Sequence, residues 1–378
     1  MDMDFTRYSR HILLPRVGME GQRKLNQASV LIIGAGGLGS PISLYLAAAG
    51  VGRIGLVDPD QVTVSNLQRQ ILYSTSQAGE DKVIAAKRRL TDLNPGCQVD
   101  IFPTTFTAQN ARDIAEGFDS LVDGTDNLTT RYLINDLCVL TGRPYVFGAI
   151  QQFEGQVALF DARVGPCYRC VFGVPPAAEH IPLPSDSGVF GVIPGLVGLL
   201  QAAEVLKIIL GIGDTLARKL VLINSLTASF EHIEVQKEPS CPVCGESPEI
   251  DSLLDYEQHC GATYANQPVA LPDECELTPA ELADRLDSGV AFTLVDLRTD
   301  VEREISHIPG AVPLPYHQLG KKMDDFDRES QYVLFCRAGK TSAWAVKRFH
   351  QAGFNKVSYL KGGINGWVEE TDPSMPQY

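Results

Sequence analysis

Basic residues are scarce in this chain relative to acidic ones. The 32 lysines and arginines stand against 46 aspartates and glutamates, which gives the 378 residues a net charge of −14 at neutral pH. Such an excess of negative charge repels phosphate backbones and anionic lipids, so we expect neither a nucleic-acid partner nor a membrane partner. The balance still permits a local basic pocket for the phosphates of a nucleotide.

A long uninterrupted apolar run is also missing. The amino-terminal residues MDMDFTRYSRHILLPRVG contain no continuous hydrophobic segment of the kind that forms a secretory signal. The most apolar stretch, residues 189–213, is interrupted by Pro194, Gln201, Glu204 and Lys207, which argues against a membrane span. We therefore expect a cytoplasmic protein.

Neither internal repeats nor low-complexity tracts are visible in the sequence. A chain with 44% apolar and 21% charged residues has the ordinary composition of a folded protein. At about 150 residues per domain, its length predicts two or three domains. Because cytoplasmic thiols are usually reduced, the nine cysteines are best interpreted as ligands, nucleophiles or buried side chains before disulfides.

The first two-thirds of the chain alternate short apolar runs with helical segments. Strands are predicted over 29–33, 53–57, 99–102 and 120–122, and a helix over 40–49 follows the first of them. Alternation of this kind indicates an α/β fold with a mostly parallel sheet and helices on both faces. The pattern continues to about residue 235.

The pattern changes over residues 237–275, which are rich in Pro, Gly, Cys and acidic residues. A second α/β pattern follows, with a helix opening at Thr278-Pro279, strands over 292–297 and 332–335, and a helix over 342–350. About 100 residues are enough for a small domain with its own core. The predicted organisation is a first domain over 1–248, a linker over 249–275 and a second domain over 276–378.

The first predicted strand runs directly into a glycine-rich turn. The turn has the spacing G-x-G-x-x-G and precedes a predicted helix. Its residues are Gly34, Ala35, Gly36, Gly37, Leu38 and Gly39. Glycines let the backbone approach a phosphate, and a helix N-terminus favours negative charge. Asp58 ends the next strand, where an acid can bind ribose hydroxyls. The pattern indicates a mononucleotide or dinucleotide site; the alternative is a strand–helix turn without a ligand.

Polar and basic residues follow in the segment SNLQRQ, residues 65–70, and at Lys82. Arg69 and Lys82 are candidates for neutralising phosphates, and Asn66 for binding a phosphate or sugar oxygen. The alternative is an exposed loop with a solvated lysine, because most lysines are exposed.

A third polar segment, Asp123-Gly124-Thr125-Asp126-Asn127, follows the strand predicted over 120–122. Ligands of α/β sheets bind at the carboxyl ends of parallel strands, so Asp126 is a candidate for holding Mg²⁺ on ATP phosphates. The alternative is that Asp or Asn caps the following helix. Different residues of this turn can fill the two roles.

Two C-x-x-C pairs are formed by Cys167 with Cys170 and by Cys241 with Cys244. Four thiolates make a closed, structural tetrahedral zinc site, which here would join two distant segments of the first domain. The alternatives are a redox C-x-x-C or two unrelated pairs, but two pairs in one cytoplasmic chain favour zinc.

Four other cysteines have simpler interpretations. Cys97 and Cys138 are expected to be small packing side chains. Cys260 and Cys275 fall in the predicted linker, where we expect exposed thiols.

Cys336 differs from these, because it ends a predicted buried strand and precedes a basic loop and a helix. Backbone N–H groups, the helix dipole, Arg337 and Lys340 all favour the thiolate, so we expect a nucleophile with a lowered pKa. The alternative is a buried cysteine at the end of a strand.

The motifs of the first domain occur in the order typical of the MoeB/ThiF family, bacterial relatives of ubiquitin-activating enzymes. They are RYSRHILL, GAGGLG, LVDPDQVTVSNLQRQ, DGTDN, GPCYRC and CPVCG, within about residues 5–247. This resemblance implies a Rossmann-like adenylation domain with a structural zinc site. It also implies that the domain binds ATP and Mg²⁺ and adenylates the C-terminal glycine of a ubiquitin-like sulfur-carrier protein.

Transferred residue by residue, the resemblance implies a set of ATP contacts beyond the glycine turn. These are Asp58, Ser65, Asn66, Leu67, Gln68, Arg69, Lys82, Asp126 and Asn127. Asp126 would be the catalytic acid that organises Mg²⁺, while Arg69 and Lys82 would offset phosphate charge. Arg10 matches an arginine that enters the ATP site of the neighbouring subunit, which implies a homodimer.

The second domain resembles a rhodanese domain in its segments VDLRTDVEREISHIPGAV, FCRAGKTS and LKGGINGW. This resemblance implies a persulfide on Cys336, loaded by a cysteine desulfurase or by thiosulfate. The loop that would hold it consists of Cys336, Arg337, Ala338, Gly339, Lys340 and Thr341. Asp296 and Arg298 are expected to maintain the fold rather than perform chemistry.

Two positions depart from the family patterns. Some relatives carry a cysteine in the loop that is spelled HIPLPSDSGVFG here, residues 180–191, but this chain has Pro184 at that position. A covalent relay through that loop therefore lacks its thiol. Lys340 stands where rhodanese loops often have arginine, which keeps the charge but loses the planar fork.

Together these patterns predict an adenylyltransferase fused to a sulfurtransferase that converts a carrier's C-terminal glycine into a thiocarboxylate. The resemblance favours a MoaD-like carrier, with a ThiS-like carrier as the alternative. One competing hypothesis is a carrier-binding scaffold with a separate thiosulfate sulfurtransferase activity. The other, an NAD-dependent dehydrogenase, accounts only for the glycine turn and Asp58.

Overall fold

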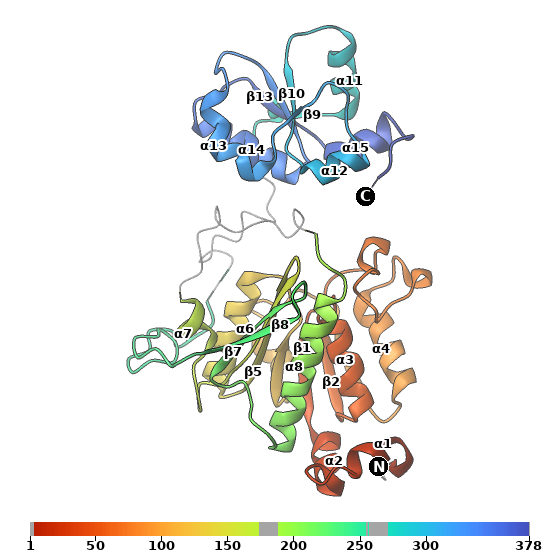
Figure 1. The fold of residues 1–378 in the computed structure, drawn as a ribbon, viewed down its shortest axis with the longest axis vertical. Coiled ribbons are helices and arrows are strands. Elements are labelled where there is room, and N and C mark those ends of the chain that lie inside the picture. Colours follow the sequence, from red (N-terminus) through yellow and green to blue (C-terminus); the bar gives the residue numbers. More distant parts are fainter. Residues whose placement is uncertain (1–3, 174–187, 255, 257–270, 378) are drawn as a thin grey trace. The chain divides into compact units, whose positions relative to one another are not determined.

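A computed structural model describes residues 4–173, 188–254, 256 and 271–377. The chain forms two compact units, Met1–Thr263 and Tyr264–Tyr378. Figure 1 colours the first unit from red to green and most of the second from cyan to blue.

The first unit is built around one large sheet. Its strands are β1 (Ser29–Ile33), β2 (Arg53–Val57), β3 (Gln98–Phe102), β4 (Ser120–Asp123), β5 (Tyr145–Gln151), β6 (Glu154–Phe160), β7 (Lys219–Asn224) and β8 (Ser229–Glu234). Its helices are α1 (Phe5–Ile12), α2 (Gly18–Gln27), α3 (Gly39–Ala49), α4 (Lys82–Leu93), α5 (Ala111–Ala115), α6 (Leu128–Thr141), α7 (Tyr168–Phe172) and α8 (Ile193–Leu210). Short 3₁₀ turns lie at Val64–Asn66 and Thr75–Gln77.

The strand order is β3-β2-β1-β4-β5-β6-β7-β8, and β3 to β5 are parallel. The chain crosses from β1 outward to β2 and β3, then returns to the other side of β1 with β4. The order therefore reverses between β1 and β4, which is where an open α/β sheet leaves a crevice at the carboxyl ends of its strands. The predicted parallel sheet is confirmed over this half.

The other half of the sheet differs from the predicted mostly parallel pattern. β5 pairs with β6, β6 with β7, and β7 with β8 in antiparallel ladders. β8 is the edge strand, and nearly all of its residues are exposed. The pattern of apolar and polar residues along a segment indicates a strand but does not indicate whether the strand pairs in a parallel or an antiparallel way.

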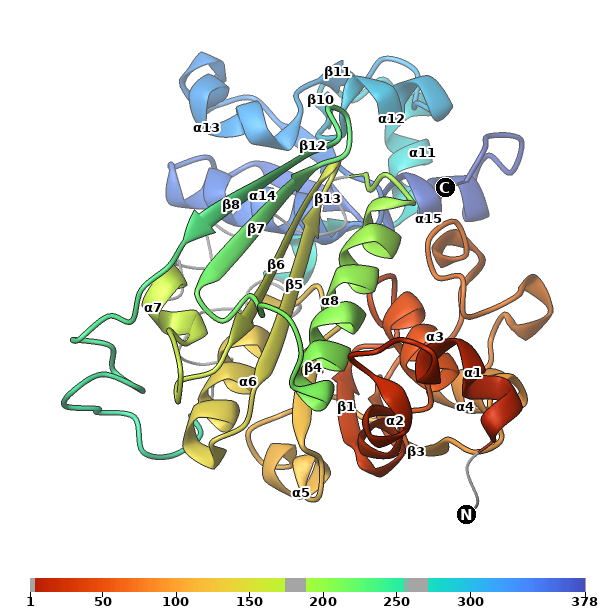
Figure 2. The same ribbon diagram turned by 60° about the horizontal axis from the view of Figure 1, so that its bottom comes forward.

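Helices cover both faces of the sheet, as predicted. One core cluster joins side chains of α2, α3, α4 and α8 to one face, and a second joins α5, α6 and α7 to the other. Figure 2 shows α8 in front of the central strands and α6 behind them. α8 is long and apolar enough to cross a membrane by length and composition alone, with half of it buried in the protein. It packs against α3, β5 and β6, as a core helix does.

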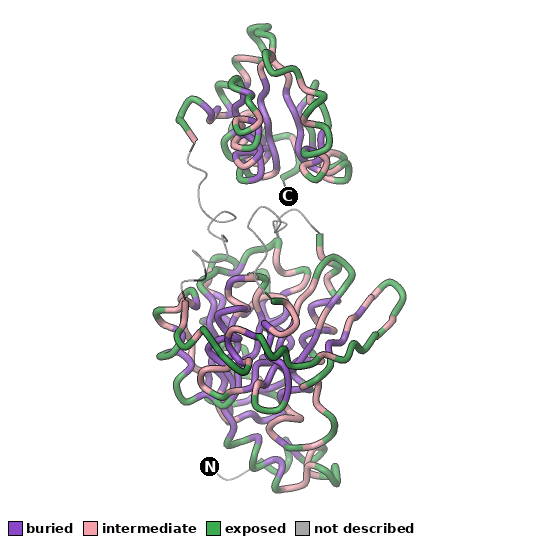
Figure 3. Tube along the Cα trace, turned by 90° about the vertical axis from the view of Figure 1, so that its left-hand side faces the viewer, coloured by how far each residue is buried: buried purple, intermediate pink, exposed green. Residues whose placement is uncertain are grey.

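The second unit is a smaller parallel sheet in the order β11-β10-β12-β13-β9. Its strands are β9 (Glu276–Leu277), β10 (Thr293–Asp296), β11 (Val312–Pro313), β12 (Tyr332–Phe335) and β13 (Val357–Leu360). Its helices are α11 (Pro279–Asp287), α12 (Asp300–Ile305), α13 (Leu319–Lys322), α14 (Lys340–Gln351) and α15 (Gly363–Glu370), with 3₁₀ turns at Asp273–Cys275, Tyr316–Gln318 and Met323–Asp325. Two apolar clusters lie on its two faces, and Figure 3 shows buried strands inside each unit.

Of the cysteines outside the candidate sites that the structure describes, two lie where they were predicted and one does not. Cys97 and Cys138 are buried packing residues, as expected. Cys275 was expected to be exposed in the linker, and this is wrong: it is 6% exposed and belongs to a core cluster of the second unit. The 3₁₀ turn before β9 directs its side chain inward. Cys260 and Pro184 lie outside the described residues.

Candidate functional site

The glycine turn lies at the reversal of strand order, pressed against the turn that follows β4. Gly34 has φ +93°, a conformation that favours glycine. A Cβ on Gly39 would lie 2.0 Å from the Gly34 carbonyl oxygen, and a Cβ on Gly124 would lie 2.3 Å from the same atom. The two turns are therefore so closely packed that only glycine fits at these positions.

Asp58 and Lys82 form the side of the site next to the glycine turn. Asp58 is 6% exposed and accepts a hydrogen bond from the Ala35 N–H at 2.8 Å. The Lys82 ammonium lies 3.8 Å from Asp58 and 2.8 Å from Asp60. Burial raises the pKa of Asp58, while Lys82 and two backbone N–H groups oppose the shift. The alternative of a solvated lysine is wrong, since Lys82 is only 3% exposed.

The SNLQRQ loop brings Arg69 to the glycine turn. The Arg69 guanidinium donates to the Asn66 amide oxygen at 3.0 Å, and a Cβ on Gly37 would lie 3.6 Å from Arg69 Cγ. Ser65 and Gln68 are exposed, whereas Leu67 is half-buried against the core. Of the predicted contacts in this loop, the structure thus places Arg69 against the glycine turn, with Asn66 bound to its guanidinium.

The turn after β4 is tied together by Asp123, which is fully buried. Its carboxylate accepts from the Thr125 N–H and hydroxyl, at 2.8 and 2.7 Å, and from the Tyr145 hydroxyl at 2.9 Å. The Arg131 guanidinium lies 3.4 Å away. Burial raises the pKa of Asp123, and Arg131 and the hydrogen bonds oppose that shift.

The residues of the same turn were expected either to cap the following helix or to hold Mg²⁺, and one of them takes the capping role. The Asn127 side chain accepts from the Thr130 N–H at 3.1 Å and so caps α6. Asp126, one position earlier, is exposed, and no hydrogen bond or ion pair is found for it within the described chain. The cap explains Asn127, whereas Asp126 keeps an exposed carboxylate whose charge interacts with Arg131.

Arg10 is not brought to this site by its own chain. α1 packs where α3 and α4 end, because Asn94 donates to the Tyr8 hydroxyl at 2.8 Å and to the Ala47 carbonyl at 2.6 Å. α3 begins at the glycine turn, and its 11 residues span about 16 Å at 1.5 Å per residue. The exposed Arg10 therefore lies at the opposite end of α3 from the nucleotide site.

The four cysteines of the two C-x-x-C pairs converge. Their sulfur atoms all lie within 4.8 Å of one another, with 3.8 Å between Cys167 and Cys170, 3.6 Å between Cys167 and Cys241, and 3.4 Å between Cys170 and Cys244. Tetrahedral zinc with bonds of about 2.3 Å requires sulfur atoms about 3.8 Å apart. The thiolate set and its spacing therefore fit a closed tetrahedral zinc site.

A buried ion pair connects this cluster to α6. Arg169, between the first two cysteines, donates to both oxygens of the fully buried Asp136 at 2.8 Å. The Tyr256 hydroxyl donates to the same carboxylate. The segment after the second cysteine pair is in this way tied back to the helix that begins beside Asp126.

Cys336 lies at the end of β12 and is 6% exposed. Its sulfur accepts from the Ser342 N–H at 3.4 Å and lies 3.5 Å from the Ser342 hydroxyl. Gly339, with φ +84°, begins α14, so the loop curls over the sulfur and presents the first turn of the helix to it. A negative charge on this sulfur faces N–H groups and the positive end of the helix dipole.

The Cys336 loop is supported by the first turn of α15. The Ile364 and Asn365 N–H groups donate to the Cys336 and Arg337 carbonyls, at 2.9 and 3.1 Å. Gly363 has φ +59°, and a Cβ there would lie 2.3 Å from the Cys336 carbonyl oxygen. The LKGGINGW motif is therefore the platform of the loop.

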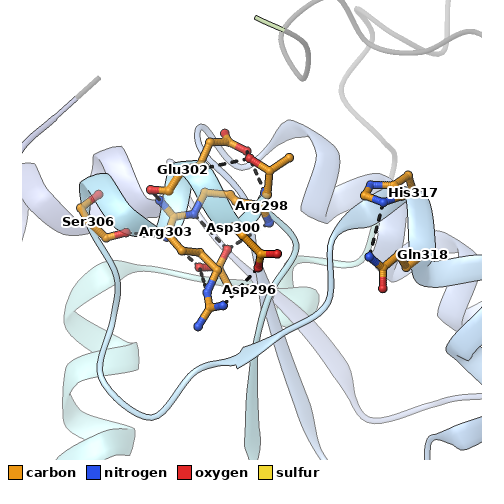
Figure 4. A network of polar contacts seen from close by, with 9 residues as sticks. Asp296, Arg298, Asp300, Glu302, Arg303, Ser306, His317 and Gln318 are labelled. Carbon is orange, nitrogen blue, oxygen red and sulfur yellow. Dashed lines mark hydrogen bonds and ion pairs between the residues drawn. The ribbon is translucent and has the colours of Figure 1, made fainter.

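Asp296 and Arg298 hold the neighbouring strand end, as expected. Arg298 is 2% exposed and makes a two-pronged contact with the fully buried Asp296, at 2.9 and 2.7 Å. It also donates to the Ser306 carbonyl at 2.9 Å, which fastens the end of α12. Figure 4 shows Arg298 and Arg303 converging on Asp296. These contacts join the end of β10 to α12, so Asp296 and Arg298 stabilise the fold of the second unit.

Comparisons with known proteins assign a family to each of the two regions. Residues 8–243 match the ThiF family, and residues 278–370 match the rhodanese-like domain. The chain belongs to the ThiF family. Its second unit adds the rhodanese-like domain, so the family resemblances of both regions are confirmed.

Relatives that match nearly the whole of this chain carry both activities in their names. "Probable adenylyltransferase/sulfurtransferase MoeZ" of Mycobacterium tuberculosis (strain CDC 1551 / Oshkosh) is 40% identical over 99% of this chain and 95% of its own. "Adenylyltransferase and sulfurtransferase MOCS3" of Mus musculus is 39% identical over 99% and 87%. The protein is an enzyme of this adenylyltransferase and sulfurtransferase group.

Two further comparisons cover the ThiF region alone. "Sulfur carrier protein adenylyltransferase" of Thermus thermophilus is 51% identical over 68% of this chain and 97% of its own. The crystal structure of Escherichia coli MccB with ATP is 27% identical, with a TM-score of 0.56, over 63% of this chain and 74% of that one.

Some residues of the two candidate sites escaped the sequence prediction. Asp123 was only part of a motif, but it organises the turn beneath Asp126. Gln70 is 5% exposed, lies beside Gly36, and its Oε1 has no hydrogen-bond partner in the described chain. Ser342 contacts the Cys336 sulfur. The signals were present, since all three stand inside or next to the motifs.

Proposed function

We propose that this enzyme adenylates the C-terminal glycine of a ubiquitin-like sulfur carrier and then transfers sulfur to it from a persulfide on Cys336. The arrangement that carries the proposal is the crevice between β1 and β4. There the glycine turn packs against the turn after β4 that carries Asp126, and Arg69 and the Asp58–Lys82 pair lie beside the glycines. The carrier is of MoaD type by the family resemblance, with ThiS type as the alternative.

The first step joins two anions. A carboxylate oxygen of the carrier attacks the α-phosphorus of ATP, and the bond to pyrophosphate breaks, leaving carrier–AMP. Arg69 and Lys82 spread the charge that collects on the phosphates, and the turn holds the phosphate chain in line. The exposed Asp126 carboxylate supplies the oxygen donor that Mg²⁺ prefers, and the bound ion would neutralise phosphate charge.

The second step uses the other unit. The terminal sulfur of the Cys336 persulfide attacks the acyl carbon, AMP leaves, and an acyl disulfide joins carrier and enzyme. A reductant or second thiol then cleaves the S–S bond, giving the carrier thiocarboxylate, free Cys336 and the oxidised reductant. Linking both catalysts in one chain raises the effective concentration of the second reactant.

A cavity of about 480 Å³ lies on the antiparallel strands and is lined in part by Arg131, which also contacts Asp123. Its other polar lining includes the side chains of Gln151, Gln156 and Asn224 and the carboxylates of Glu154 and Glu231. A carrier terminus is an extended, mostly polar peptide, so it suits a polar groove whose wall includes Arg131, the residue that contacts Asp123. We assign this groove to the carrier.

Two features support a homodimer. Arg10 is too far from the site of its own chain, so it reaches an ATP site only in a partner. The outer side of α8 presents Leu196, Leu199 and Ala203, which are partly or largely exposed on an apolar helix. A second copy would cover that stripe. The zinc that fits the four cysteines would be structural, because no ligand position remains open.

The test is ATP–pyrophosphate exchange by the full-length protein, with MoaD-type and ThiS-type carriers added singly. Exchange that depends on one carrier and is lost with Asp126→Ala supports adenylation and names the pathway. Carrier binding without exchange favours the scaffold instead. Mixing Arg10→Ala with Asp126→Ala protein tests the dimer: recovered exchange supports an arginine supplied by the partner, and its absence contradicts it.

A further inference from the structure

One buried polar residue stands out in the apolar helix α8 and has no role so far. Gln201 is fully buried, and its Nε2 donates to the Asp123 carbonyl at 2.7 Å and to the Val146 carbonyl at 3.4 Å. Both acceptors are at the point where the β4–β5 ladder stops, since the last matched pair is Val122 with Val146. The amide bridges the two strands where their own pairing ends.

The protein makes room for this amide. A Cβ on Gly148 would lie 2.4 Å from Gln201 Cδ, so β5 has a glycine where the side chain enters. Two carbonyl oxygens face the same end of the amide, which only the NH₂ group can satisfy. The Gln201 Oε1 has no hydrogen-bond partner in the described chain, an unfavourable state for a buried polar atom.

The Asp123 carbonyl is the last acceptor before the turn that presents Asp126. On the other side, the Gly124 N–H donates to the Ile33 carbonyl at 2.7 Å and fixes the turn to β1. Within the turn, the Asp123 carboxylate holds Thr125. Toward β5, the Tyr145 hydroxyl binds the Asp123 carboxylate and Gln201 binds the Asp123 carbonyl, so Gln201 is the group that holds the backbone leading to Asp126 on this flank.

We propose that Gln201 is a positioning residue of the adenylation site, which sets the place of the Asp126 carboxylate by anchoring the end of β4 from α8. The inference rests on the proposed function. It predicts that loss of the Gln201 amide displaces the turn, although Gln201 itself touches neither nucleotide nor carrier.

The test compares Gln201→Met with a matched variant, Glu204→Met. Glu204 is one turn further along α8, 3% exposed, and accepts from the Leu216 N–H at 2.8 Å, away from the turn. Both variants remove the polar contacts of one buried side chain from the same helix: two carbonyls for Gln201, and the Leu216 N–H and Lys207 for Glu204. We expect Gln201→Met to lower kcat for exchange about 10²-fold and to raise the Mg²⁺ concentration it requires, with KM for ATP nearly unchanged. Glu204→Met keeps wild-type kcat and Mg²⁺ dependence at an equal loss of thermal stability.

Hydrogen exchange of peptides covering residues 121–131 gives a readout that needs no activity. Faster exchange there in Gln201→Met, but not in Glu204→Met, supports the anchor even if the wild-type enzyme lacks pyrophosphate exchange, which would refute the proposed function alone. Equal behaviour of the two variants overturns the inference. If Gln201→Met does not fold, Gln201→Asn shortens the side chain by one methylene and is judged by the same measurements.

Discussion

The two candidate sites are built in opposite ways. The proposed nucleotide site draws on separate segments at Gly34–Gly39, Asp58, Asn66–Arg69, Lys82 and Asp126, which are far apart in the chain and meet through the strand order. The Cys336 site lies within one loop and the start of α14, supported by Gly363. A site assembled from many segments depends on buried contacts far from it, whereas a site made by one loop depends on local backbone geometry.

The two sites also differ in whether one copy of the chain provides all of their groups. The nucleotide crevice has its arginine, Arg10, at the far end of α3 and is completed only by a second copy under our proposal. The Cys336 loop obtains its N–H groups, its helix N-terminus and its platform from one unit. Damage to dimerisation should therefore affect adenylation and spare sulfur transfer to a small acceptor.

The largest expected effect is a clean separation of the two activities. Asp126→Ala should reduce ATP–pyrophosphate exchange by about 10²–10³-fold, because the charge on the phosphates loses its organising carboxylate. Thiosulfate-to-cyanide sulfur transfer should stay at the wild-type rate. Cys336→Ser should show the reverse. Exchange that survives Asp126→Ala would refute the role of that carboxylate.

The zinc cluster should matter to the first unit only. Cys244→Ser removes one of four sulfur ligands, and loss of a structural metal costs about 4 kcal/mol or more of unfolding free energy. Metal content by mass spectrometry and two-transition thermal unfolding check this: bound zinc should fall and only the first unit should become less stable. An unchanged metal content would show that the cysteines hold no zinc.

A single methyl group should disable the sulfur site locally. Gly363→Ala combines φ +59° with a contact of 2.3 Å to the Cys336 carbonyl, which displaces the loop. We expect sulfur transfer to fall about 10²-fold from the misplaced sulfur, with exchange unaffected. Gly289→Ala is the matched control, because Gly289 has φ +70° in the same unit but open space around it. Equal losses in both variants would contradict the platform role.

The smallest expected effect is a pH response of the second unit. Hydrogen bonds from Lys361 and Tyr359 hold the pKa of Glu276 below its ordinary 4.5. A depressed pKa means that the charged form is favoured in the fold, so this stabilisation is present above pH 4.5 and is lost as pH falls through the folded-state pKa. Denaturant unfolding measured at pH values below and above 4.5 gives the unfolding free energy of the second unit as a function of pH. This free energy should fall as the pH is lowered, and it should fall less in Glu276→Gln. If the unfolding free energy of the variant depends on pH as strongly as that of the wild type, Glu276 is not the cause of the pH dependence.

The sequence predicted the local elements well, because strands such as Ser29–Ile33 and Tyr332–Phe335 are apolar runs bounded by turn residues. Cysteine spacing predicted the Cys167–Cys244 cluster. Burial of Lys82 was missed, since its charge partners Asp58 and Asp60 meet it only through the fold. Gln201 was visible only as an interruption in an apolar helix, because its acceptors belong to strands distant in the chain.

The central claim is that one chain both activates the carrier and supplies its sulfur. The most direct test is mass spectrometry of the purified carrier after incubation with ATP, Mg²⁺, thiosulfate, a reductant and the full-length protein. We predict a C-terminal thiocarboxylate with wild-type protein, carrier–AMP without thiocarboxylate with Cys336→Ser, and unmodified carrier with Asp126→Ala. Thiocarboxylate formation by Cys336→Ser at the wild-type rate would contradict the account.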